Sequence, residues 1–239
     1  MEKDIKKIII NKATDMGAAK IGFGNLNGYL PEELSHLNTG ISIAIRLSDQ
    51  IINDIKDKPT FTYFHHYRTV NFLIDQITLQ ITTILQNRGY LAMAVPASQT
   101  VKTSKDAYRG IFQHRTAATL SGLGWIGKNA CLVTEEFGPR VRLGTVLTNL
   151  PVDYDTPITE SKCGKCNICV SNCPALALKG NKWYPGIPRD ELVDAYACST
   201  FMNEHYKGIG RGSVCGLCIS KCPKGIKVLK INKAAKQPY

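Results

Sequence analysis

The sequence lacks any apolar run long enough to cross a membrane as a helix. Its N-terminus, MEKDIKKIII, is charged, and its three-residue apolar run is too short for a secretion signal. Nowhere do roughly 18 apolar residues follow one another. Two nucleotide signatures are also missing, a GxGxxG after a strand and a GxxxxGK[ST] loop. These absences predict a soluble, cytoplasmic protein without a membrane partner and without a Rossmann or P-loop nucleotide site.

Acidic residues are few, with 19 Asp and Glu against 30 Lys and Arg, which gives a formal charge of +11. Hydrophobic residues make up 44% of the chain and charged residues 21%, a balance that excludes a disordered or collagen-like protein. The excess of positive charge indicates a solvated basic surface or an acidic partner. Nucleic acid, an acidic electron carrier and an anionic ligand all fit such a surface.

The nine cysteines are distributed unevenly along the 239 residues. Cys131 stands alone, and the other eight lie between Cys163 and Cys222. The segment 151–157, PVDYDTP, has the composition of a linker. We therefore expect two domains, an α/β domain over residues 1–150 and a cluster-binding domain over residues 151–239. Because strands and helices alternate only loosely, the fold class expected is α+β with a mixed sheet.

Hydrophobic periodicity and breakers predict the elements of the first domain. The clearest signal follows Pro59, where apolar residues recur at steps of three and four from Val70 to Leu85 and Gly89 stops the helix. A second helix is expected at the N-terminus, and several short strands follow. The predicted strands are 18–23, 41–47 and 90–95, and the segments 131–134 and 141–148 are expected to pair as a hairpin through Phe137-Gly138-Pro139.

The first cysteine motif is C-x2-C-x2-C-x3-C-P, the run that bacterial-type ferredoxins use for cubane clusters. Three thiolates at this spacing can curl round one [4Fe–4S] cluster, and the fourth, before a proline, faces a different cluster. The motif consists of Cys163, Cys166, Cys169 and Cys173.

A second set repeats the later half of that motif, ending at Cys222-Pro223, with Cys198 upstream as the missing ligand. Crossing the fourth ligands predicts two [4Fe–4S] clusters. One would be held by Cys163, Cys166, Cys169 and Cys222, and the other by Cys198, Cys215, Cys218 and Cys173. Paired CxxC units also bind structural zinc, but two C-P endings favour clusters. The ninth cysteine, Cys131, is expected to be a buried, inert thiol.

Upstream stands the glycine-rich turn GLGWIGKN, residues 122–129, whose glycines permit close approach of a ligand or of another element. Together with the hairpin and both cysteine sets, it resembles the epoxyqueuosine reductase family, called QueG. The related reductive dehalogenases are more distant. The resemblance covers roughly residues 60–230 and implies a nitroreductase-like first domain. It also implies a cobalamin-type corrinoid beside two [4Fe–4S] clusters, with electrons passing through the clusters to cobalt and a small substrate.

By this resemblance, the corrinoid would lie near the turn and near the segment 98–114. The residues expected to contact it are Gly122, Gly124, Trp125, Gly127, Lys128 and His114. The family's aspartate proton donor lies about 14 residues before the turn, and at that distance this chain has Tyr108, with Asp106 two residues away. Tyr108 and Asp106 are therefore the candidate catalytic residues.

The family's members continue into helical repeats that help to grip tRNA, whereas this sequence stops at Tyr239. We therefore expect tRNA to be an unlikely partner. A lysine at every third position from Lys221 to Lys236 fits a solvated tail or the docking of an acidic electron donor such as ferredoxin or flavodoxin. The function expected is that of an iron–sulfur oxidoreductase. The alternative is an electron-transfer or activator protein without a substrate of its own.

Overall fold

The computed structural model describes residues 2–99, 108–210 and 213–225. The chain forms two compact units whose segments interleave along the sequence. Unit 1 comprises residues 1–46, 69–123 and 142–158, and unit 2 comprises residues 47–68, 124–141 and 159–239. The compact units thus do not follow one cut near residue 150, because 47–68 and 124–141 join the cysteine-rich segment. The division into 1–150 and 151–239 remains a proposal about function.

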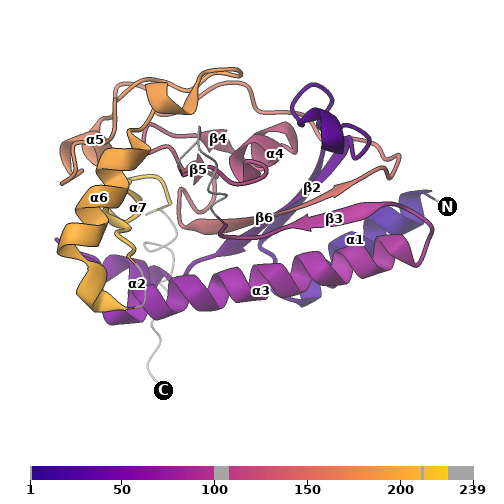
Figure 1. The fold of residues 1–239 in the computed structure, drawn as a ribbon, viewed down its shortest axis with the longest axis horizontal. Helices are drawn as coiled ribbons and strands as arrows, with labels where there is room; N and C mark the ends of the chain where they lie inside the picture. Colours follow the sequence, from indigo (N-terminus) through magenta and orange to yellow (C-terminus); the bar gives the residue numbers. More distant parts are fainter. Residues whose placement is uncertain (1, 100–107, 211–212, 226–239) are drawn as a thin grey trace, which may run out of the picture. The chain divides into compact units, whose positions relative to one another are not determined.

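Unit 1 is built on a four-stranded sheet (Figure 1). The strands follow one another in the order β1, β2, β6 and β3, that is Lys20–Asn25, Thr39–Arg46, Val141–Thr148 and Ala92–Val95. β1 pairs antiparallel with β2, with Phe23 opposite Ile41, and β3 pairs antiparallel with β6, with Val95 opposite Thr145. The expected α+β class is therefore confirmed.

The helices of unit 1 bury one apolar side each. α1 spans Glu2–Asp15, α4 spans His114–Leu120, and a single 3-10 turn covers Glu32–Leu34. α3 runs from Phe61 to Gln86 and carries the periodic apolar residues that predicted it. The residues on its buried side within unit 1 are Val70, Ile74, Ile77, Ile81 and Leu85. The long predicted helix is therefore confirmed.

The predicted hairpin of 131–134 with 141–148 is wrong. β5 is only two residues long, Leu132–Val133, and it pairs with β4, Trp125–Ile126. β6 instead pairs with β3 in the sheet of unit 1. The chain between β5 and β6 closes on itself through a single bridge, Thr134 to Gly138, and Pro139 follows it. Proline has no N–H to continue a ladder, so the pairing stops there.

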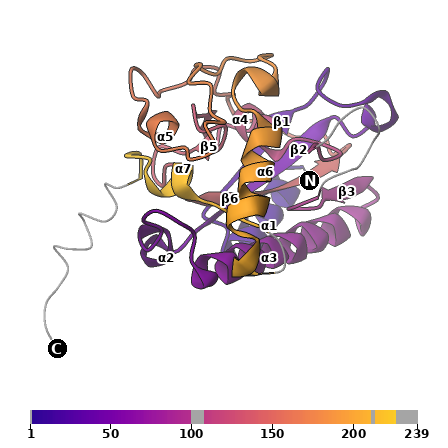
Figure 2. The same cartoon turned by 60° about the vertical axis from the view of Figure 1, so that its left-hand side comes forward.

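Unit 2 contains the β4–β5 hairpin, the first turns of α3 and short helices. Two of these helices, α5 (Ile168–Ser171) and α7 (Leu217–Ser220), lie side by side (Figure 2). α6 (Ala195–His205) begins at Asp194, whose carboxylate accepts a hydrogen bond from the Ala197 N–H at 2.9 Å. The remaining short elements are α2 (Asp49–Asn53) and 3-10 turns at Arg189–Glu191 and Lys207–Ile209.

Close packing fixes the inserted segments of unit 2. The Arg140 guanidinium, 2% exposed, donates to Asp49 at 3.3 Å and to Asn53 at 3.0 Å. A Cβ on Gly216 would lie 2.7 Å from the Tyr63 ring, so the start of α3 rests against the backbone before α7. In the part of the chain that the structure describes, no helix is both long and apolar enough to span a membrane.

The packing of α3 on β6 gives a first prediction. A Cβ on Gly144 would lie 2.5 Å from Ile74 Cγ2 and 3.1 Å from Thr78 Cγ2. Both side chains are β-branched and stiff, so Gly144→Ala should lower the free energy of unfolding by about 1–3 kcal/mol. Gly208→Ala is the matched control, because nothing lies within 4 Å of its Cβ position. Denaturant unfolding of both variants checks this, and equal effects would contradict the packing.

Candidate iron–sulfur centres

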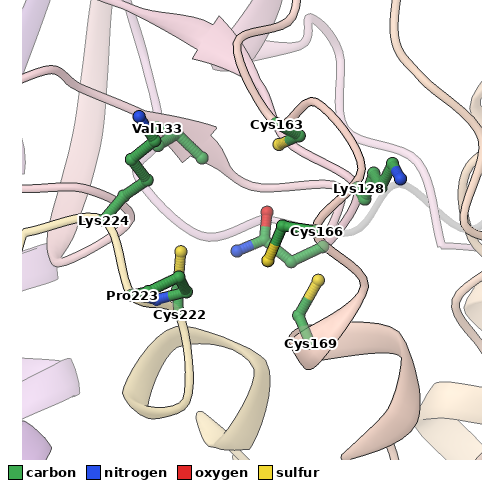
Figure 3. A pocket seen from close by; sticks show the side chains of 9 residues that line it. Lys128, Val133, Cys163, Cys166, Cys169, Cys222, Pro223 and Lys224 are labelled. Carbon is green, nitrogen blue, oxygen red and sulfur yellow. The ribbon is translucent and has the colours of Figure 1, made fainter.

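Four cysteine thiols from two distant stretches of the sequence surround one cavity in unit 2 (Figure 3). Three come from the first motif, two on the turn that leads into α5 and Cys169 in α5 itself, and the fourth directly precedes Pro223. These are Cys163, Cys166, Cys169 and Cys222, the group that the crossed scheme assigns to one cluster. We call them the first thiol group.

The thiols of this group act on one another electrostatically. The pKa of the Cys222 thiol is raised to about 12, chiefly by burial. The backbone of Lys224 lowers it by a hydrogen bond, and the neighbouring Cys169, Cys163 and Cys166 contribute to the rise. Burial likewise raises the pKa of Cys169 to about 11, with Cys163 and Cys166 adding to it. Bound iron cations would offset this repulsion and keep the cysteines as thiolates, the form that binds metal.

The other cysteines gather in a second thiol group, Cys173, Cys198, Cys215 and Cys218. Burial raises the pKa of Cys198 to about 11, and the charges of Cys215 and Cys173 contribute to the rise. The pKa of Cys215 is also raised, chiefly by burial, and the charge of Cys173 contributes to the rise. The structure thus brings Cys173 of the first motif to the second group, as the crossed scheme predicts. The assignment of these thiols as ligands remains a proposal.

Cys131 lies beside the second thiol group. The pKa of Cys218 is raised above its ordinary value chiefly by a hydrogen bond with the Cys131 side chain, and burial adds to the shift. Cys131 is partly exposed, so the expectation of a buried thiol is wrong. Sequence spacing could not reveal this contact, because 87 residues separate the two cysteines.

The loop 127–131 between β4 and β5 contacts both thiol groups. Lys128 and Asn129 line the cavity of the first group. The Asn129 amide donates to the Cys218 carbonyl at 3.3 Å, and Lys128 Nζ donates to Asn167 Oδ1 at 2.7 Å. Asn167 lies between Cys166 and Cys169. Both asparagines escaped the sequence reasoning, since no spacing rule links them to their partners.

The glycines of the 122–129 turn approach protein atoms. A Cβ on Gly122 would lie 2.8 Å from the Thr156 carbonyl, and one on Gly127 would lie 2.6 Å from Asn129 Oδ1. A Cβ on Gly124 would collide with the Val133 carbonyl. The sequence left open whether these glycines allow the approach of a ligand or of another part of the chain. At all three positions the nearest atoms belong to the chain itself. They are therefore no evidence for a corrinoid cradle.

Trp125 is almost fully buried, and the ammonium groups of Lys162 and Lys224 lie 5.6 and 5.7 Å from the centre of its ring. Its indole Nε1 is buried without a hydrogen-bond partner among the described residues. Lys224 also lines the cavity of the first thiol group. Of the lysine series, Lys227 to Lys236 lie outside the described residues, so the docking prediction rests on sequence there.

Among the predicted site residues of unit 1, His114 begins α4. Both ring nitrogens of His114 are hydrogen-bonded, Nε2 to the Pro96 carbonyl at 3.0 Å and Nδ1 to the Thr145 hydroxyl at 2.9 Å. Because a carbonyl only accepts, Nε2 carries the proton and Nδ1 accepts from Thr145. Tyr108 is 40% exposed and has a left-handed backbone, with φ of 64°. Asp106 lies outside the described residues.

Comparison with known proteins agrees with the cysteine pattern. Residues 160–226 match the 4Fe-4S dicluster domain family. An epoxyqueuosine reductase from Listeria monocytogenes is 36% identical over 110 residues, which cover 44% of this chain and 28% of that enzyme. One from Atelocyanobacterium thalassa is 28% identical and covers 92% of this chain and 79% of the enzyme. The alignment with the Listeria enzyme thus spans less than a third of that relative's length.

Solved structures show the same fold. An epoxyqueuosine reductase crystallised with a tRNA-Tyr epoxyqueuosine-modified stem loop matches 94% of this chain and 66% of its own, with a TM-score of 0.60 and 21% identity. A reductive dehalogenase whose structure suggests a mechanism for B12-dependent dehalogenation matches 94% of this chain and 33% of its own, with a TM-score of 0.72 and 17% identity. The predicted resemblance is therefore confirmed, as is the predicted dicluster domain.

The grouping of the thiols predicts that Cys198 is needed to bind iron and that Cys131, beside the second thiol group, is not. Cys198→Ser should lose about half of roughly eight iron atoms, because one cluster loses a ligand. Cys131→Ser, which alters a neighbour of the same group, should keep all of them. Iron and sulfide analysis after anaerobic reconstitution measures both. Full iron in Cys198→Ser, or a loss in Cys131→Ser alone, would contradict the grouping.

His114 predicts a dependence of stability on pH. Burial lowers its pKa to about 4, and the charge of Arg142 contributes, although the Pro96 carbonyl opposes the shift. Between pH 6.5 and 4 only the unfolded chain binds this proton, so its contribution to stability is lost as the pH falls. The loss reaches about 3 kcal/mol. In His114→Gln, urea unfolding at pH 7 and pH 4.5 should show a smaller loss on acidification. An equal loss would contradict a neutral His114.

Proposed function

Because the chain is a relative of the epoxyqueuosine reductases with a 4Fe-4S dicluster domain, we propose that it is an iron–sulfur reductase. Single electrons would pass through two [4Fe–4S] clusters to a cobalamin-type cofactor and then to a small substrate. The observation that carries the proposal is the convergence of four thiols, from residues as far apart as 163 and 222, on one cavity.

The first thiol group fits a cluster better than a zinc ion. Zinc holds four sulfurs at about 2.3 Å from a single point. Here the sulfurs surround a cavity, and no three His, Cys, Asp or Glu side chains of the described ranges are close enough to share one ion. Bound clusters would supply one-electron transfer, while the protein supplies the thiolates, the apolar surroundings and the local charges.

Support for the corrinoid comes from the likeness to the B12-dependent dehalogenase structure. In unit 1, the segment predicted to lie near it exposes two large apolar side chains, Tyr108 at 40% and Ile111 at 43%. The apolar face of a corrin macrocycle could cover such a surface. The contacts from residues 122–128 and from His114, the roles of Tyr108 and Asp106, and the nitroreductase-like character of the first domain belong to this proposal.

The comparisons do not favour the alternative of an activator protein without a substrate, because the named relatives are reductases. Ferredoxin or flavodoxin remains the proposed electron donor. The expectation that tRNA is an unlikely partner finds no support, since a structure of the same fold contains a tRNA stem loop. Such a stem loop therefore belongs beside small molecules among the substrates to be tested.

Cobalamin binding tests the proposal. The anaerobically reconstituted chain should bind hydroxocobalamin at micromolar protein, measured by its absorbance after gel filtration. Ile111→Asp should weaken binding about tenfold, because it places a charge in the apolar surface. Leu79→Asp alters another exposed apolar side chain of unit 1, on α3, and should bind as the wild type does. A protein with full iron that binds no corrinoid would contradict the reductase mechanism and favour the activator.

A further inference from the structure

Lys128 is a buried cation beside the first thiol group. Its residue is 6% exposed, and lysines are almost never so buried unless a charge balances them. Its Nζ donates to Asn167 Oδ1, a neutral acceptor, at 2.7 Å. Within the described ranges, no carboxylate forms an ion pair with it. Arg140, the other buried cation there, is paired with Asp49.

The position of Lys128 identifies its balancing charge. The side chain lines the same cavity as the four thiols (Figure 3). Asn167, which accepts the hydrogen bond from its Nζ, lies in the sequence between Cys166 and Cys169. Four thiolates around a [4Fe–4S]2+ core carry a net charge of about −2, which becomes about −3 on reduction. A cluster bound here would therefore compensate the buried ammonium, and more strongly when the cluster is reduced.

The loop holds Lys128 there rigidly. The Gly127 N–H donates to the Cys131 carbonyl at 2.9 Å, and the Ala130 N–H donates to the Gly127 carbonyl at 2.8 Å. The Cys131 N–H donates to Asn129 Oδ1 at 3.1 Å. These bonds fix the backbone on both sides of Lys128, and the hydrogen bond to Asn167 Oδ1 at 2.7 Å holds its ammonium group.

The second thiol group has a charge of the opposite sign beside it. Asp194 caps α6 one turn before Cys198, with the Cys198 N–H donating to the Asp194 carbonyl at 3.1 Å. Its carboxylate accepts a hydrogen bond at 2.9 Å from the N–H of Ala197, the residue directly before Cys198. A negative charge opposes the addition of an electron, just as a positive charge favours it.

We infer that Lys128 and Asp194 set the order of the two reduction potentials, so that an electron passes from the second cluster to the first. The inference rests on the proposed function, which supplies the two clusters and a ferredoxin or flavodoxin as one-electron donor. The reduced second cluster returns from the 1+ to the 2+ state, and the first goes from 2+ to 1+. No proton moves and no bond changes. Lys128 and Asp194 are positioning charges that do not touch the substrate.

The test is a potentiometric titration of the reconstituted full chain, followed by the electron paramagnetic resonance of its reduced clusters. In Lys128→Met, the midpoint potential of one cluster should fall by about 59 mV, which is a tenfold change in the equilibrium constant of a one-electron reduction. The midpoint potential of the other cluster should stay unchanged. In Asp194→Asn, which can still cap α6, the other midpoint should rise. Lys128→Arg keeps the charge and should keep both midpoints.

Lys165→Met is the matched control. It removes a lysine between Cys163 and Cys166, closer to the ligands in sequence, but one that is exposed to solvent and therefore screened. A shift as large as that of Lys128→Met, or unchanged midpoints in Lys128→Met with full iron, would overturn the inference alone. If Lys128→Met loses iron, retention in Lys128→Arg supports the charge and loss there overturns it. A wild type without clusters would overturn the proposed function as well.

Discussion

Thiolates crowded into one compact unit repel one another unless cations lie between them. In unit 2, burial first and this repulsion after it raise the pKa of thiols as far apart in sequence as Cys169 and Cys222. Their supporting helices, α5 and α7, are four residues long and too short to be stable alone. Iron–thiolate bonds would supply the stability that these short helices lack, and they would couple the folding of unit 2 to the filling of its sites.

The β4–β5 hairpin connects the two sites. Glycines let its strands and the preceding turn approach their neighbours closely, and the loop between the strands meets both thiol groups. One short segment thus places a buried ammonium at one site and an amide and a thiol at the other. This arrangement gives the two sites different neighbours, although each has four cysteines.

Local patterns predicted what depends on local spacing. The periodic residues of α3 predicted which side of the helix is buried. The two C-P endings predicted that the thiols group in a crossed way, and Cys173 does lie near Cys198. The pairing of β6 with β3 was missed because the alternation of apolar residues in β6 fits either neighbour, β3 or the segment 131–134, equally well. The environments of Lys128 and Cys131 were missed because each depends on a contact with a residue tens of positions away. Such contacts leave no periodicity in the sequence.

The family likeness and the geometry contribute different parts of the account. The likeness to epoxyqueuosine reductases supports the proposed class of chemistry, and the geometry shows which thiols of this chain could hold a cluster. The corrinoid belongs to the first part, since the glycine turn is explained by packing within the chain. Two [4Fe–4S] clusters are supported both by the family likeness and by the geometry of the thiols. Their presence is therefore the central claim.

Mössbauer spectroscopy of the chain produced with 57Fe and purified without oxygen tests that claim most directly. The account predicts about eight iron atoms per chain, all with the signature of [4Fe–4S]2+ cubanes and matched by an equal amount of sulfide. Bound zinc in place of iron, or iron for only one cubane at full occupancy, would contradict it.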